Sequence, residues 1–122
     1  MITHPKTEEL VRSVALWLEQ IRPQLDPRNA FLARVAGNAL ATVERELTQG
    51  PAAEAEAVTL MAQLLGHQGD FEALNAELCA AIRDGRFTVE TPGLLPALQT
   101  MARNQLAIDQ PNYRPEGASA RP

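Results

Sequence analysis

The sequence predicts an all-α fold, a single-domain antiparallel bundle of about five helices followed by an irregular C-terminal arm. Twenty alanines and sixteen leucines outnumber the ten valines and isoleucines together, and alanine and leucine lose little rotamer freedom in a helix. Apolar residues recur at helical spacing between proline, glycine and aspartate punctuation. A length of 122 residues suits one domain. Aromatic residues make up only 4% of the chain, so we expect a core of leucine and alanine.

Five helical segments follow from the apolar spacing. They are expected near residues 5–21, 27–49, 51–65, 71–84 and 94–110. In the first segment one stripe has the spacing of a buried helix face, and it consists of Leu10, Val14, Trp17, Leu18 and Ile21. Leu16 falls on the opposite, charged face of the same helix. This segment is therefore predicted to be amphipathic, with one apolar side chain out of place.

The second and third segments are separated by a glycine and a proline. Asp26 precedes Pro27 and is expected to cap the second helix. Its predicted buried stripe is Leu32, Val35, Ala36, Ala39, Leu40, Val43 and Leu47. Gly50 is expected to end this helix in a left-handed conformation, and Pro51 to begin the third.

The last two helices also carry local start and stop signals. Asp70 is placed to cap the fourth helix, and Gly85 to close it. Pro96 cannot lie deep inside a helix, so the fifth begins near Leu94. We predict that Leu40 and Leu78 are core residues. The proline-rich stretch after Gln110 predicts a bundle domain over residues 1–110 and a tail or arm over residues 111–122.

Charge and composition narrow the class of protein. The formal net charge is −4 and the arginines are scattered singly, which argues against a nucleic-acid partner because phosphate binding needs clustered cations. The first twenty residues carry several charges, and the longest charge-free run, residues 57–69, is shorter than the roughly twenty residues that span a bilayer. We therefore expect a soluble cytoplasmic protein without a membrane partner.

The usual signatures of catalysis and cofactor binding are absent from the sequence. There is no phosphate-binding loop, GxGxxG, HExxH or GxSxG motif. The single cysteine, Cys79, excludes an internal disulfide and a cysteine-based zinc site. The two histidines, His4 and His67, lack acidic partners at helical spacing. We expect no metal and no cofactor.

Polar residues interrupt three of the predicted apolar stripes, and they are the tentative ligand-binding residues. Glu46, Asn75 and Gln105 each fall within such a stripe, and Asp109 lies on the edge of the last one. A buried polar group without a partner is costly, so these residues either meet one another around a ligand or emerge into solvent near helix ends. The sequence leaves both alternatives open.

Three runs resemble a bacterial family of small helical proteins. They are FLARVAGNALATVEREL from residue 31, LNAELCAAIRDG from residue 74 and LAIDQPNY from residue 106. The family is catalogued as domain of unknown function 6285. The resemblance implies a helical protein often encoded beside acyl-CoA dehydrogenases and aminoglycoside-phosphotransferase-like kinases. It transfers no catalytic residue.

Three functions follow, in order of preference. The first is a non-catalytic accessory or interaction protein for a kinase-like or acyl-CoA dehydrogenase partner, with Leu16, Tyr113 and Arg114 as interaction residues and self-association as one form of the contact. The second is a helical module that binds a small molecule in a polar pocket. The third is an enzyme that uses the carboxylates of that pocket, Glu46 and Asp109, as acid and base.

Overall fold

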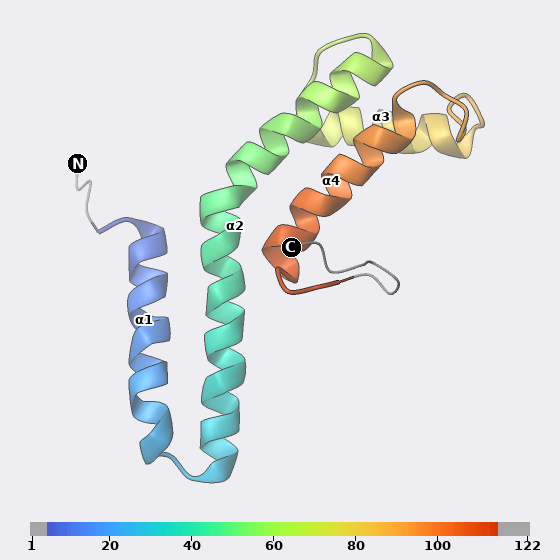
Figure 1. Cartoon of the computed structure of the whole chain (residues 1–122). Coiled ribbons are helices and arrows are strands. Elements are labelled where there is room, and N and C mark those ends of the chain that lie inside the picture. The colour runs from blue at the N-terminus through green and yellow to red at the C-terminus, as the bar shows by residue number, and fades with distance from the viewer. Residues whose placement is uncertain (1–4, 115–122) are drawn as a thin grey trace, which may run out of the picture. The chain divides into compact units, whose positions relative to one another are not determined.

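The computed structural model describes residues 5–114, and every regular element in that range is helical (Figure 1). The helices are α1 (Thr7–Ile21), the short 3₁₀ helix η1 (Arg22–Gln24), α2 (Pro27–Leu65), α3 (Phe71–Arg83) and α4 (Leu94–Asp109). The prediction of an all-α helical bundle is confirmed. Within residues 5–114 no helix is both long and apolar enough to cross a membrane.

The prediction of five helices is wrong, because the expected second and third helices form one. α2 runs without interruption from Pro27 to Leu65 and contains Pro51. Gly50 is not among the glycines with positive φ, which are Gly66, Gly85 and Gly93. Proline fixes φ near the helical value, so its cost here is one missing N–H and crowding of the carbonyl four residues earlier. The alanine- and glutamate-rich segment after Pro51 favours the helix on its C-terminal side.

The other local signals end and begin helices as expected. The Asp26 carboxylate accepts a hydrogen bond from the backbone N–H of Asn29 at the start of α2, at 3.3 Å. The Asp70 carboxylate accepts from the backbone N–H of Ala73 at the start of α3, at 2.8 Å. Gly66 and Gly85 follow the ends of α2 and α3 with φ near +80°. α4 begins at Leu94 and keeps Pro96 in its first turn, where no backbone donor is needed.

The chain divides into two compact units, Met1–Pro51 and Ala52–Pro122, called unit 1 and unit 2 below. α4 ends at Asp109, and a turn follows it at residues 111–112. The expected division into residues 1–110 and 111–122 stays a prediction, since most of that tail lies outside the described residues.

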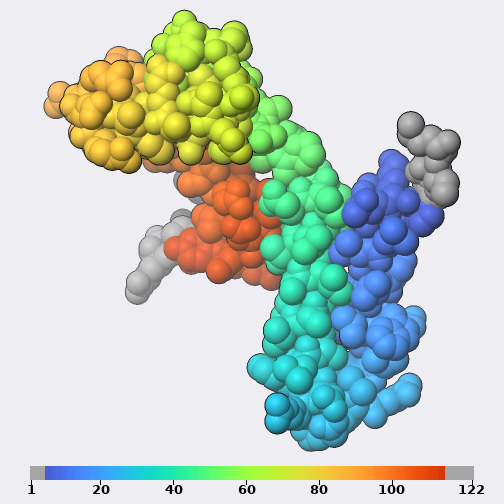
Figure 2. All heavy atoms as spheres, turned by 180° about the vertical axis from the view of Figure 1, so that it is seen from behind, coloured from blue at the N-terminus to red at the C-terminus, as the bar shows by residue number. Residues whose placement is uncertain are grey.

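Unit 1 is a hairpin of two antiparallel helices. α1 lies beside the first half of α2 in both views (Figures 1 and 2). The Arg12 Nε–H donates to the Glu44 carboxylate at 2.6 Å across the two helices. Among the described residues of this unit only Ala33 is a buried apolar residue. Leu40, a predicted core residue, is half-buried.

Unit 2 contains a connected hydrophobic core. The last part of α2 packs with α3 and α4, and the cluster of buried residues is Ala57, Met61, Ala62, Leu74, Leu78 and Leu94. Met61 and Leu74 have no exposed surface. The prediction that Leu78 is a core residue is confirmed, since its exposed fraction is 3%. Asn104 on α4 donates its side-chain N–H to Glu56 on α2 at 2.8 Å, which joins the two helices at the surface.

Candidate protein-interaction surface

The apolar surface of α1 is wider than the stripe that α2 covers. At about 100° per residue, Val11, Ala15 and Leu18 lie on the side of α1 that faces α2, and all three are half-buried. The neighbouring stripe has a similar heptad-like spacing and consists of Leu10, Val14, Trp17 and Ile21. Of these, Trp17 is 56% exposed and Leu10 is 52% exposed. The prediction of a buried stripe is therefore wrong for Leu10, Val14 and Trp17, whereas its other members, Leu18 and Ile21, are half-buried.

The first half of α2 repeats this arrangement. Ala33, Gly37 and Leu40 lie toward α1 and are buried or half-buried. A second apolar stripe lies beside them, within an arc of about 80° on the same helix, and comprises Leu32, Ala36, Ala39, Val43 and Leu47. Leu32 remains 49% exposed and Val43 44% exposed. The prediction of a buried stripe on this helix is thus partly confirmed for Leu40, which is half-buried. It is wrong for Leu32, Val35, Val43 and Leu47, which are exposed.

The two exposed stripes lie on the same side of the hairpin. In one view along the axes, successive residues turn clockwise on one helix and counterclockwise on an antiparallel neighbour. On each helix the exposed stripe lies at a smaller helical angle than the stripe that contacts the other helix. The two exposed stripes therefore lie on the same face of the hairpin. We call this the hairpin face, and its members are Leu10, Val14, Trp17, Ile21, Leu32, Ala36, Ala39, Val43 and Leu47. None of them carries a charge.

The opposite side of the hairpin is charged. Arg12 and Glu44 form the ion pair between the helices, and Arg22 pairs with Glu19 within one turn of the chain. Arg34 also lies on this side by its helical position. The pKa of Arg12 is raised above its ordinary value, mainly by its hydrogen bond to Glu44 and then by the charge of that carboxylate. Unit 1 therefore has one ionic face and one apolar face.

The predicted interaction residues all lie at the surface, but on different units. Leu16 is 57% exposed and lies away from the hairpin face on α1. Tyr113 is 50% exposed in unit 2, where its backbone N–H donates to the carbonyl of Gln110 at 2.9 Å. The Arg114 guanidinium donates to the Tyr113 carbonyl at 3.0 Å. Their role in an interface stays a prediction.

The four predicted ligand-binding residues are exposed. Gln105 and Asp109 lie one turn apart on α4 and share a hydrogen bond of 2.9 Å. Asn75 is exposed on α3, and Glu46 is exposed on α2 within unit 1. The structure thus brings Gln105 and Asp109 together. Binding of a small molecule by the set stays a prediction, which loss of affinity in Glu46→Gln with an unchanged fold would support.

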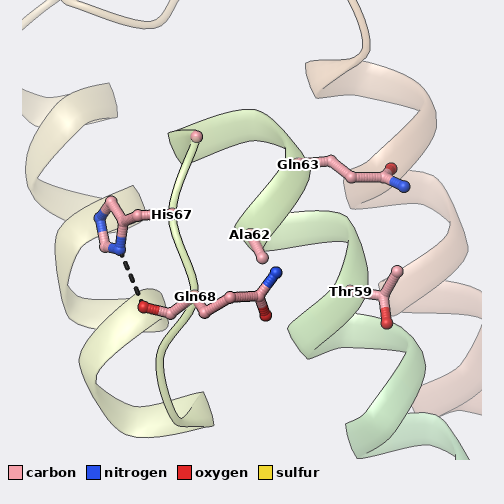
Figure 3. Close-up of a pocket in the computed structure, with 6 residues that line it drawn as sticks. Thr59, Ala62, Gln63, His67 and Gln68 are labelled. Atoms are coloured by element: carbon pink, nitrogen blue, oxygen red, sulfur yellow. Dashed lines mark hydrogen bonds between the residues drawn. The ribbon is translucent and has the colours of Figure 1, made fainter.

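A shallow hollow of about 350 Å³ lies at the turn between α2 and α3. Figure 3 shows Thr59, Ala62 and Gln63 on α2 and His67 and Gln68 on the loop that lines it. One ring nitrogen of His67 hydrogen-bonds the Gln68 carbonyl at 3.0 Å and the other the Glu77 carboxylate at 2.6 Å. Both interactions raise the pKa of His67, the Gln68 carbonyl most. These contacts hold the turn against α3.

The exposed titratable groups of this hollow provide little for chemistry. His67 has half of its side chain in solvent, and Glu77 is 39% exposed. In residues 5–114 no group of three or more histidine, cysteine, aspartate or glutamate side chains could hold a metal ion. Cys79 is exposed on α3. We therefore place the candidate functional surface on the hairpin face.

Comparison with known proteins gives one result. The family described as Domain of unknown function (DUF6285) matches residues 23–113, about three quarters of the chain. The chain belongs to this family. No curated protein and no solved structure matches the sequence. The resemblance noted from the three sequence runs is thereby confirmed.

The family match covers α2, α3 and α4 and leaves α1 outside. The α2 half of the hairpin face consequently lies within the DUF6285 region, and the α1 half precedes it. Sequence reasoning missed this face as a functional surface because it took every apolar stripe as core. One signal was present: the apolar arc of α1, from Trp17 around to Ala15, spans about 160°, more than the roughly 100° that one buried face needs.

Proposed function

We propose that this protein is a non-catalytic accessory protein that acts by binding other proteins through the hairpin face. The observation that carries the proposal is the concentration of exposed apolar side chains on unit 1. Nine of the fourteen large apolar residues that are exposed in residues 5–114 belong to this unit, and six of these nine lie on the hairpin face. Large contiguous apolar patches on a protein surface mark interaction sites, whereas scattered single residues do not.

The form of the surface supports a protein partner more than a small ligand. The hairpin face is built from two helices and is open along their length, whereas a small-molecule site is a concave pocket that encloses most of its ligand. Trp17 lies in the middle of the α1 stripe, and tryptophan is among the residues most often responsible for binding energy at protein interfaces.

The partner class comes from the family resemblance. A kinase-like or acyl-CoA dehydrogenase polypeptide is the candidate, and contact with it would take place in the bacterial cytoplasm. The net charge of −4 supports a protein over a nucleic acid, because a nucleic-acid surface would need clustered cations. On this proposal the hairpin face contributes apolar contact area and the partner contributes the chemistry.

The test is an affinity capture from cytoplasmic extract of the source bacterium with the full chain as bait. We compare the wild type with a Val14→Glu, Val43→Glu double variant, which adds two charges to the hairpin face. The matched control is Val89→Glu, because Val89 is 74% exposed in unit 2. A kinase-like or acyl-CoA dehydrogenase polypeptide should bind the wild type and the control and be lost with the double variant. Equal recovery with all three baits would refute the proposal.

A further inference from the structure

We infer that the first occupant of the hairpin face is a second copy of this chain, and that two hairpins pair to form a four-helix bundle. This inference rests on the proposed function, because it takes the same face as an interface: the second copy covers the face until the partner protein replaces it. Unit 1 buries only Ala33 among its described apolar residues, so its two helices lack the core that a small helical unit needs. A second hairpin supplies an equal apolar face with the same deficit.

The size of the face suits such a pairing. From Leu32 to Leu47 it is about 22 Å long, and two helices side by side are roughly 20 Å wide, so its projected area is roughly 400 Å². Accessible area exceeds projected area because side chains are uneven. The projected area is about half of the ~800 Å² per partner of an ordinary stable interface, which suits a dimer that dissociates on dilution, and it lies within the ~300–600 Å² of the largest apolar patches on monomers.

The order of side chains along α2 is self-complementary. The exposed stripe reads Leu32, Ala36, Ala39, Val43 and Leu47. When two such stripes run antiparallel about a point half a residue beyond Ala39, Leu32 of one copy meets Leu47 of the other, and Ala36 meets Val43. Each pairing is repeated on the other side of the two-fold axis, which is the property of an isologous interface. In this register Trp17 of each copy lies near the middle of the interface along the helix axis, at the outer edge of α1.

Charges at the border of the face agree with this register. Arg28 and Glu46 lie at the same angular position on the outer edge of α2, eighteen residues apart, and both are exposed. Antiparallel pairing about Ala39 brings Arg28 of each copy to about 7 Å from Glu46 of the other along the helix axis. A long arginine side chain can span that gap. The outer edge of α2 therefore carries opposite charges at its two ends, and these charges are complementary between two antiparallel copies. The hairpin face itself contains no charged residue.

Trp17 is the only tryptophan of the chain, so its fluorescence reports directly whether the hairpin face is covered. We would measure sedimentation velocity and tryptophan emission of the full chain from about 0.1 to 100 μM, where interfaces of less than standard size dissociate. The inference expects a dimer at high concentration with blue-shifted emission, and a monomer on dilution with emission moving to the red.

Two variants keep the tryptophan and break the face. Val14→Glu and Val43→Glu should each weaken the dimer by at least about thirtyfold, since each places an unpaired charge in the interface. Val89→Glu in unit 2 should leave dimerisation unchanged. Circular dichroism on each variant reports whether the helices persist. A dimer that resists both hairpin-face substitutions but is lost in Leu16→Glu would overturn the inference and favour the opposite side of α1.

A charge exchange tests the register without touching the apolar residues. Arg28→Glu and Glu46→Arg should each weaken self-association, because each sets like charges opposite one another. A mixture of the two singly substituted chains should form a mixed dimer, since both ion pairs are then restored with reversed polarity in one of them. No gain of association on mixing would overturn the antiparallel arrangement.

The outcomes separate this inference from the proposed function. A monomer with red emission at every concentration overturns the second copy as occupant but leaves the affinity capture to decide whether another protein binds. A monomer with blue emission at every concentration means that the chain covers the face itself, and it overturns both.

Discussion

Units 1 and 2 are made of similar helices but differ in how they dispose of apolar residues. Unit 2 buries nine of the ten apolar residues that are buried in residues 5–114, whereas unit 1 buries one. Conversely, unit 1 holds most of the large apolar residues that remain exposed. The hydropathy of the helices does not explain this, since α1 is as strongly amphipathic as α3 by its residue pattern. The number of neighbouring helices explains the difference.

Three helical segments can enclose a core between them, but two cannot. In unit 2 the end of α2 packs with both α3 and α4, and Met61 and Leu74 lie between them without exposed surface. In unit 1 each helix has one neighbour, so each covers one stripe of the other and leaves the next stripe in solvent. The lesson is that an amphipathic pattern predicts a surface to be covered and does not say by what.

Core substitutions should show the largest contrast between the units. Leu78→Ala removes a side chain that is 3% exposed and should cost roughly 2 to 5 kcal/mol of the free energy of unfolding. Leu40→Ala removes a half-buried side chain and should cost less than about 2 kcal/mol, because part of it already contacts water. Urea denaturation followed by circular dichroism measures both. Equal losses would break the comparison and show that unit 1 has a core of its own.

The cap of α3 tests how far unit 2 depends on local signals. Asp70→Ala removes the acceptor for the Ala73 N–H and should cost about 1 kcal/mol. Asp70→Asn, which keeps a capping oxygen, is the control and should recover most of the loss. If alanine and asparagine behave alike in urea denaturation, the capping bond does not contribute to stability.

Substitution of Gly50 tests the continuity of α2 by its sign. Glycine inside a helix is destabilising relative to alanine, so Gly50→Ala should stabilise the protein by roughly 0.5 to 1 kcal/mol. The new Cβ would lie 3.0 Å from Oε1 of Glu46, and that flexible, exposed side chain can move away. Had Gly50 been the left-handed cap, alanine would be strained and the change would be destabilising. Thermal unfolding decides between the two signs.

The smallest expected effects are pH-dependent and differ between the units. In unit 1 the pKa of Asp26 is lowered, mainly by the hydrogen bond from the Asn29 side chain and then by that from its backbone. The stability it contributes is present above its unfolded pKa, near 3.9, and is lost as pH falls through the lower folded pKa. An Asp26→Asn variant should lose this acid dependence. NMR titration of the Asp26 carboxyl carbon gives the folded pKa, and an ordinary value would contradict the expectation.

In unit 2 the pH dependence of stability has the opposite sign. The raised pKa of His67 means that its contribution is fully present below the unfolded pKa, near 6.5, and is lost as pH rises through the folded pKa. Glu77→Gln should lower the pKa of His67 in a ring-proton NMR titration, because it removes the charge that favours the imidazolium. The Gln68 carbonyl remains in that variant, so the pKa should return only part of the way. No change would show that Glu77 does not act on His67.

Much of the local structure could be predicted from the sequence. Asp26, Asp70 and Gly85 are short-range signals, and each acts on a helix terminus within a few residues of itself. The prediction failed at Gly50 and Pro51, where two local stop signals are adjacent and the helix continues. A proline inside a helix costs about 3 kcal/mol, and packing of the segment after Pro51 in the core of unit 2, through Ala57 and Met61, offsets that cost.

The candidate surface was less accessible to sequence reasoning. The polar residues singled out as ligand-binding, Glu46, Asn75, Gln105 and Asp109, are all exposed. Only Gln105 and Asp109 lie near a helix end, since α2 continues past Glu46 to Leu65. Conversely, Trp17 and Val43 were taken as core and lie half in solvent. A helical projection gives the angle of each side chain around the helix axis, but it does not show whether another helix covers that side.

The sequence by itself determined that this protein is helical, where most of its helices begin and end, and which side of each helix is apolar. These properties depend on residues within a few positions of one another, through capping bonds, rotamer freedom and the period of 3.6 residues. Only the tertiary structure decided that residues 27–65 form one helix and that unit 2 has a buried core while unit 1 presents an open apolar face. Coverage depends on contacts between residues far apart in the chain, and two helices have too few neighbours to cover each other.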